Sequence, residues 1–170
     1  MTVDYKLDAV VEIRKYLWEQ LSTIGIFDDA DYYSDNIGDT VIPILPVQQQ
    51  AELNQFLSGK KHIVYDKVSS SYDTMWYICN EQLLFTIYST DVSEINEIRN
   101  FMTDLFRRMD ESAHDVNRWS GLSNKFKFHS IYISDISATT PSEELQGFLS
   151  TDVILDVKYS RITDGLGRFV

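Results

Sequence analysis

Histidine and cysteine are the residues best suited to bind a metal or act as a nucleophile, and the chain has few of them. The histidines are His62, His114 and His129, and the single cysteine is Cys79. No histidine stands in the clustered spacing that a zinc site requires. His62 and His129 fall in strand-like segments, which favours ordinary sheet histidines. Cys79 lies in an apolar, aromatic run that indicates a buried thiol rather than a nucleophile, and one cysteine cannot form an intrachain disulfide.

Motifs for covalent or phosphate chemistry are also missing from the sequence. It contains no G-x-S-x-G elbow, and the terminal glycine pair at 165 and 167 lacks the third glycine and the helix of a dinucleotide site. A small enzyme could assemble a site from distant residues, around His129 and Asp135 or around His114 and Asp115. Nothing in the local sequence supports either pair. We therefore expect no catalysis, no cofactor, no metal and no sheltered cluster of polar side chains.

Carboxylates are concentrated in residues 27–39, where five aspartates invite a calcium interpretation. They are Asp28, Asp29, Asp31, Asp35 and Asp39. An EF-hand loop places ligands at alternate positions, followed by a glycine and a final glutamate. Here Tyr33 occupies the slot that follows Asp29 and Asp31. The spacing favours a solvated acidic loop.

The overall charge restricts the possible partners. The formal net charge of −11 argues against a nucleic-acid surface and against docking on an anionic membrane. The chain starts without a recognisable signal peptide and has no apolar stretch of membrane-spanning length. These features predict a cytoplasmic chain, or part of an assembly built in the cytoplasm. Residues 125–128 interleave lysine with phenylalanine, but the two phenylalanines share a strand face and are predicted to lie in the core.

With 170 residues, 44% of them hydrophobic, the chain is predicted to fold as a single domain over 1–170, with a loose tail from about 163. Apolar residues at helical spacing predict a helix over 7–24. Pro43 and Pro46 make 41–47 an extended edge segment, and 48–57 fits a short helix. A second helix begins at Asp91, with Glu94 completing a capping box, and runs to 109 or as far as 116.

Strands account for most of the remainder. The pattern predicts a strand over 62–68, a loop over 69–73, and a hairpin of strands 74–79 and 82–89 turning at Asn80-Glu81. The two hairpin strands are apolar enough to suggest burial on both faces. Two further strands, 125–134 and 148–162, flank a loop over 135–147. The predicted fold class is α+β, with a single mostly antiparallel sheet and two main helices packed on one face.

Several of these features together resemble a known family. They are the proline-containing segment at 42–44, a G-x-x-x-I-V-Y-D strand from Gly59 to Asp66, the aromatic hairpin at 76–88, the aspartate-capped helix at 91–109 and two closing strands. In this order and size the chain resembles the tail-terminator (tail-completion or neck) proteins of tailed bacteriophages. The similarity extends from the first helix to the last strand, and no single motif is diagnostic of it.

The resemblance implies a structural protein of the virion. Such proteins form a six-membered ring that caps the tail tube, stops its growth and offers a face to the head connector. DNA passes through the ring without specific binding, and there is no active site. The implied partners are other copies of the chain, the tail-tube protein and head-connector or neck proteins. Another neck or baseplate protein would share this composition, and a small enzyme is the remaining alternative.

A ring subunit needs two different contact surfaces, and exposed aromatic side chains are typical of such contacts. Tyr32 and Tyr33 in the acidic loop and Phe169 in the tail are candidate docking residues, with ordinary packing as the competing interpretation. The five aspartates of the loop are candidates for an acidic channel wall, which would repel DNA.

Overall fold

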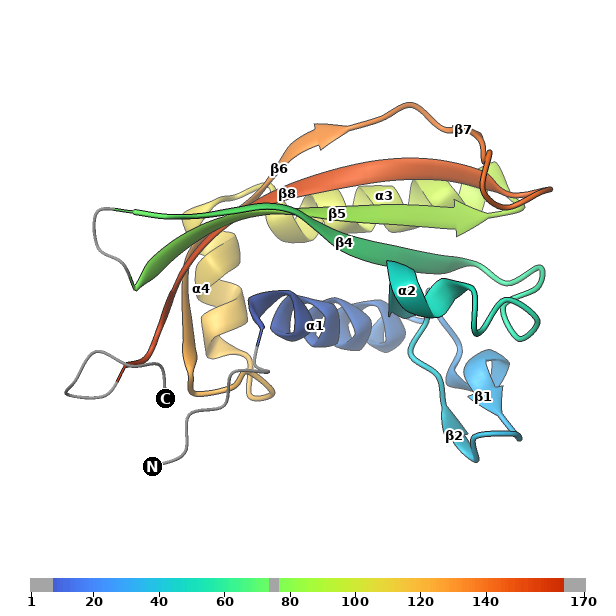
Figure 1. Ribbon diagram of the computed structural model, residues 1–170, viewed down its shortest axis with the longest axis horizontal. Helices are drawn as coiled ribbons and strands as arrows, with labels where there is room; N and C mark the ends of the chain where they lie inside the picture. Colours follow the sequence, from blue (N-terminus) through green and yellow to red (C-terminus); the bar gives the residue numbers. More distant parts are fainter. Residues whose placement is uncertain (1–7, 74–76, 164–170) are drawn as a thin grey trace.

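The computed structural model describes residues 8–73 and 77–163, and these form one layer of helices on one layer of sheet (Figure 1). The main sheet has the strand order β3-β4-β5-β8-β6, with β7 also paired to β8. All of its pairings are antiparallel except β3 with β4. The predicted α+β class is confirmed. Three helices, α1, α3 and α4, lie on one face of the sheet rather than the two expected.

The helices and strands have the following bounds. The helical segments are α1 (Ala9–Thr23), the 3-10 helix η1 (Asp29–Tyr32), α2 (Val47–Gln50), α3 (Val92–Phe106) and α4 (Asp110–Arg118). The strands are β1 (Tyr33–Ser34), β2 (Asp39–Thr40), β3 (Ile44–Pro46), β4 (His62–Tyr72), β5 (Ile78–Ser89), β6 (Phe126–Ile136), β7 (Thr140–Pro141) and β8 (Leu149–Arg161).

Side-chain caps explain where the two long helices begin. The Asp8 carboxylate accepts a hydrogen bond from the Val10 amide at 3.3 Å, and Asp91 accepts one from the Ser93 amide at 2.9 Å. The second helix does not continue to residue 116 as the apolar pattern suggested. Met109, with φ of +44°, breaks the chain direction between α3 and α4. Two helices therefore replace one.

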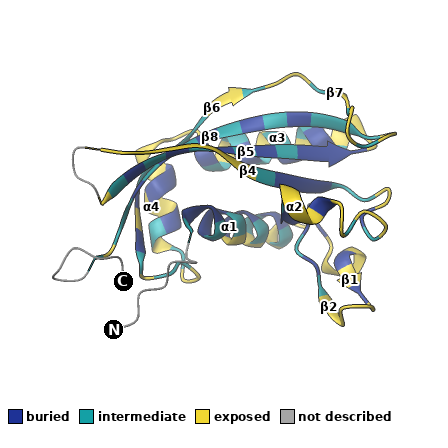
Figure 2. Ribbon diagram, in the orientation of Figure 1, coloured by how far each residue is buried: buried dark blue, intermediate teal, exposed yellow. Residues whose placement is uncertain are grey.

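The core lies between the helices and one face of β5 and β8. Leu83 pairs with Leu155 and Phe85 with Val153, and all four side chains are buried (Figure 2). These apolar residues of β8 thus lie on the face of the sheet that the helices cover. The opposite face of β5 carries half-buried residues such as Gln82 and is not covered by a helix. The prediction that this strand is buried on both faces is wrong for residues 78–86, and only residues 87–89 at its end are all buried.

The hairpin between β4 and β5 turns elsewhere than predicted. β4 continues through the serine-rich residues 69–72, which were expected to form a loop, because β5 offers them a partner strand. Asn80 pairs with Ser71 and Glu81 with Ser70, so Asn80-Glu81 lies inside β5 rather than at a turn. The chain reverses between Asp73 and Ile78, and residues 74–76 of the predicted strand lie outside the described residues.

The segment from 27 to 46 is more structured than the loop and extended edge segment that were predicted for it. Residues 29–40 form η1 and the small β1–β2 hairpin. The proline-containing segment forms β3 at the sheet edge, as predicted, and runs parallel to β4. Leu45 of β3 packs with Val41 and Leu57 in a small second core. Among the helices of the described residues, none combines the length and apolar character needed to cross a membrane.

Candidate interaction surfaces

The predicted acidic loop projects from one end of the molecule (Figure 1). We call residues 28–40 the acidic projection. Asp28 caps η1 through the Ala30 amide at 3.0 Å, and Asp39 accepts from the Thr40 amide at 2.7 Å. The five aspartates named above are all exposed, and none forms an ion pair within the described ranges. Their negative charge is therefore presented to solvent or to a partner.

The two tyrosines of this projection have opposite roles. Tyr32 is only 2% exposed, and its hydroxyl donates to the Lys61 carbonyl at 2.6 Å while its ring meets Phe27 edge-on at 5.5 Å. Burial raises its pKa. The prediction that Tyr32 is an exposed docking residue is therefore wrong. Its ring is packed in the core and anchors the projection there. Tyr33, in contrast, is 50% exposed to solvent. Phe169 lies outside the described residues.

At the other end, residues 66–72 of β4 and 78–82 of β5 form the part of the sheet that we call the arm, where β8 pairs with the other side of β5 (Figure 1). β3 covers the outer edge of β4 only as far as Tyr65. Within the described chain no strand pairs with that edge over residues 66–72. Val68 is 55% exposed and Tyr72 60%. An uncovered strand edge of this length with exposed apolar side chains is a template for pairing with another chain.

A sheltered polar cluster lies on the helix-facing side of this arm, contrary to the sequence expectation. The Glu81 carboxylate is buried, and its Oε1 accepts hydrogen bonds from the Tyr159 hydroxyl at 2.6 Å and the Cys79 thiol at 3.5 Å. Lys67 Nζ lies 3.3 Å from the same oxygen and 2.9 Å from Asp8 Oδ2. Lys67 thus links the arm to Asp8, the N-cap residue of α1.

The protonation of this cluster fits a structural network. Burial raises the pKa of Cys79, and burial together with the hydrogen bond to Glu81 raises the pKa of Tyr159. Burial alone would lower the pKa of Lys67, but its hydrogen bonds and charge interactions with Asp8 and Glu81 outweigh this effect and raise it. Cysteine and tyrosine therefore stay protonated near neutral pH, where neither is an activated nucleophile.

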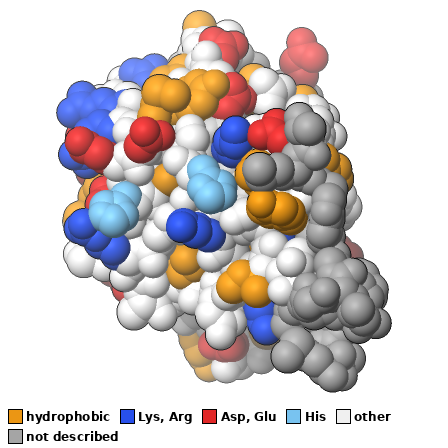
Figure 3. Space-filling view, turned by 90° about the vertical axis from the view of Figure 1, so that its left-hand side faces the viewer, with side chains coloured by type: hydrophobic (Ala, Val, Ile, Leu, Met, Phe, Trp, Pro, Cys, Tyr) orange, Lys and Arg blue, Asp and Glu red, His pale blue; other side chains and the backbone are white. Residues whose placement is uncertain are grey.

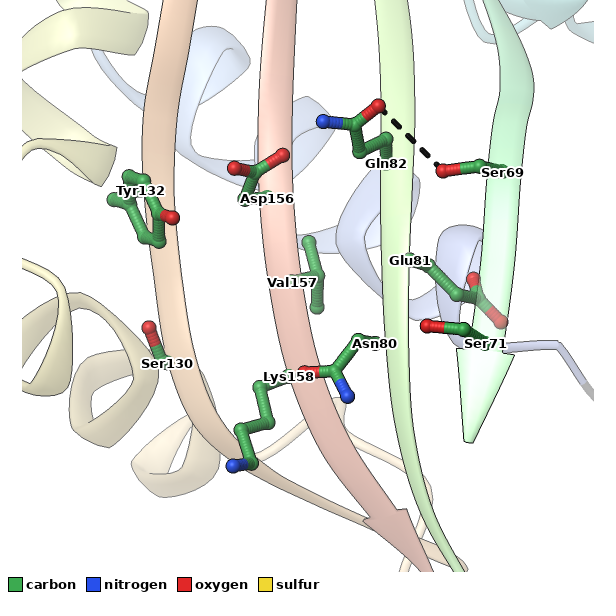
Figure 4. Close-up of a pocket in the computed structure, with 10 residues that line it drawn as sticks. All are labelled: Ser69, Ser71, Asn80, Glu81, Gln82, Ser130, Tyr132, Asp156, Val157 and Lys158. Atoms are coloured by element: carbon green, nitrogen blue, oxygen red, sulfur yellow. Dashed lines mark hydrogen bonds between the residues drawn. The ribbon is translucent and has the colours of Figure 1, made fainter. Parts of the chain in front are cut away.

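The uncovered face of the sheet holds a shallow depression of about 500 Å³, formed by β4, β5, β8 and β6 (Figure 4). Its walls are polar. Ser69 donates to Gln82 Oε1 at 3.5 Å, and Lys158 at the rim forms a 3.0 Å ion pair with Asp73. The labelled side chains are spread along four strands rather than converging on one point. This arrangement is that of a solvated sheet face and not of a site where polar groups converge on a ligand.

The histidine pairs considered for catalysis are not brought together. His129 Nε2 lies 3.0 Å from Ser160 Oγ, whereas Asp135 accepts from the Ile136 amide. His114 hydrogen-bonds to Arg118, and the neighbouring Asp115 lies 3.9 Å from Arg108.

The third histidine, His62, is buried and stacks on Tyr88 with ring centroids 5.1 Å apart. Its Nδ1 lies 2.9 Å from the Lys60 carbonyl and its Nε2 3.2 Å from Gln50 Nε2. Both ring nitrogens are therefore engaged, and burial lowers the His62 pKa. No group of three potential metal ligands occurs in the part of the chain that the structure describes.

Comparison with known proteins adds no relative to these observations. No protein-family model matches the chain, and no curated protein matches it.

Proposed function

We propose that this chain is a structural protein of a tailed-phage virion, a tail terminator or neck protein. In this role copies of the chain form a ring, six-membered as in the family that the chain resembles, that caps the tail tube and joins it to the head connector. Its place is the tail or neck of the virion, after assembly in the host cytoplasm.

The uncovered edge of β4 in the arm carries this proposal. Proteins that remain monomeric protect such edges with short strands, charges, prolines or a covering segment. Here the edge from 66 to 72, unpaired within the described residues, carries exposed Val68 and Tyr72. Its charged residues Asp66 and Lys67 and a bulge at Val68 leave the strand edge itself open. Pairing with a partner strand would satisfy its outward amides and carbonyls and would bury both side chains. Contact between protein chains is the function that this surface supports best.

The charge distribution also supports a role at a channel for DNA. A chain with net charge −11 repels the phosphate backbone, which allows passage without adhesion. The acidic projection supplies the most concentrated negative charge, with five aspartates and no lysine or arginine over residues 28–39. Those aspartates of the projection that are not used in a contact between chains would face the channel and act by repulsion alone.

Two alternatives make different predictions. Another neck or baseplate protein would use the same kind of contact, and only its position in the particle would separate the two. An enzyme would need a sheltered set of titratable side chains, and the Glu81 cluster is the most charged such set described above. The protonated state of Cys79 and Tyr159 in that cluster argues against nucleophilic catalysis.

The test compares two variants that each replace a half-exposed valine with lysine. Val68→Lys places a charge on the arm, whereas Val92→Lys alters a valine of 50% exposure at the start of α3. Native mass spectrometry and negative-stain imaging, with and without purified tail tubes, would follow assembly. We expect rings for wild type and Val92→Lys and loss of rings for Val68→Lys. A wild-type chain that stays monomeric and ignores tail tubes would contradict the proposal.

A further inference from the structure

One region of this acidic protein carries unbalanced positive charge. Residues 116–134, which we call the cationic segment, contain Arg118, Lys125 and Lys127 and no aspartate or glutamate. None of these three cations forms an ion pair within the described residues. Just before the segment, in contrast, Arg107 is paired with Asp104 and Arg108 with Glu111. Carboxylates of Glu19 and Glu12 contact the segment at Trp119 and Ser123, but none pairs with its three cations, which therefore keep their positive charge unbalanced.

The cationic segment lies at the end of the molecule that Figure 3 presents. It comprises the last turn of α4 and most of β6, and lysine, arginine and histidine side chains gather over this end together with a few carboxylates. The charge also acts on a neighbouring side chain. Burial lowers the pKa of His129, and the positive charges of Lys127 and Lys158 lower it further.

The acidic projection lies at the opposite end of the long axis (Figure 1). In one copy, the β1–β2 hairpin is therefore remote from α4 and the first residues of β6, and the two charged surfaces cannot meet within a single molecule. Both are exposed: the five aspartates, Arg118 and Lys127 all face solvent. Exposed Tyr33 and Ile37 add apolar surface to the projection. A contact between the two surfaces requires two copies.

Net charge makes this pairing the favourable one. Two copies with formal charge −11 repel each other, so association is best served where the local charge is inverted. We infer that the acidic projection of one copy docks on the cationic segment of the next. The contact joins opposite ends of the chain and is heterologous, which is the kind of interface that closes into a ring. This inference rests on the proposed ring and adds a second contact between its subunits, beside the one proposed at the β4 edge.

A charge-swap experiment tests the pairing. The first variant carries Asp29→Lys, Asp31→Lys and Asp35→Lys, which spares Asp28 and Asp39 because their carboxylates cap backbone amides. The second variant carries Arg118→Glu, Lys125→Glu and Lys127→Glu. A third combines all six changes in one chain. Sedimentation velocity and native mass spectrometry would measure association, and thermal melting would confirm that each variant is folded.

Each single-surface variant should associate about a hundredfold more weakly than wild type, because like charges then face each other across the contact. Mixing the two variants, or combining all six changes, restores opposite charges and should restore association. Raising the salt concentration should weaken association of wild type and of the six-fold variant alike.

The outcomes separate this inference from the proposed function. Rings that form equally well with either single-surface variant would overturn the pairing and leave the ring intact. If both single-surface variants fold but do not assemble, and the six-fold variant does not assemble either, the two surfaces do not bind each other. That outcome would also overturn the pairing. A wild-type chain that never associates, alone or on tail tubes, would overturn both.

Discussion

The Tyr159 hydroxyl donates a 2.6 Å hydrogen bond to Glu81 Oε1 across the β5–β8 pair, on the side of the sheet that faces the helices. A carboxylate in this position would be costly without partners, because burial removes the water that stabilises its charge. The hydrogen bond and the nearby Lys67 ammonium compensate for that loss. The cluster thereby holds the arm against the body of the protein.

Removing this hydroxyl should destabilise the fold. For Tyr159→Phe we expect a loss of about 1.5–3 kcal/mol in the free energy of unfolding, the range for a hydrogen bond to a charged group. Urea denaturation measures the change. Tyr132→Phe is the matched control: that tyrosine also lies beside a carboxylate, that of Asp156, which raises its pKa, but in an open setting. It should cost less than about 0.5 kcal/mol. Equal effects for the two variants would show that the Glu81 cluster is not a structural anchor.

His62 should make stability depend on pH. Burial lowers its pKa in the folded protein below the ordinary value of 6.5, so the unfolded chain takes up a proton more readily. The neutral ring therefore contributes stability that is fully present above pH 6.5 and is lost as the pH falls through the folded-state pKa. We expect the urea midpoint of wild type to drop between pH 7.5 and 5.5 more than that of His62→Gln. His114→Gln, at an exposed position, is the control and should keep the wild-type slope. If His62→Gln also keeps the wild-type dependence of the urea midpoint on pH, His62 is not the group responsible for it.

Met109 should be replaceable by glycine with a gain in stability. Its φ of +44° and ψ of −97° lie in a region that disfavours residues with a Cβ, at a cost of about 1–3 kcal/mol. Glycine relieves this strain, and its extra freedom in the unfolded chain offsets part of the gain. Met109→Gly should therefore raise the melting temperature by about 2–4 °C, equivalent to about 1 kcal/mol.

Arg107→Gly provides the contrasting control. Its φ of −79° suits any residue, so glycine there should cost about 0.5–1 kcal/mol. A melting temperature lowered by both substitutions would refute the strain at Met109.

Periodic burial made parts of this fold predictable from sequence. α1 and β8 carry long runs in which apolar residues recur at the period of a helix or a strand, and both were located to within two residues at each end. The arm was missed because Ser69 to Ser71 have low intrinsic strand preference and become extended only by pairing with β5. The break at Met109 was missed because no glycine marks the left-handed backbone there.

The candidate surfaces were harder to predict. Tyr32 and Tyr33 are adjacent and similar, and only the folded chain shows that one hydroxyl reaches the Lys61 carbonyl while the other ring stays exposed. Glu81 is a single acid within an apolar run. It could have been recognised as buried from its place between Cys79 and Leu83 on one strand face, once the hairpin turn was put at the correct position.

Hydrogen exchange at the β4 edge tests the central claim most directly. Backbone amides of residues 66–72 would be followed by mass spectrometry in the isolated chain and in the chain assembled into rings or onto tail tubes. If this edge is the contact between chains, its exchange should slow by about tenfold or more on assembly, while the exposed residues at the start of α3 keep their rate. Rings or tube complexes that form while residues 66–72 exchange as fast as in the isolated chain would contradict the account.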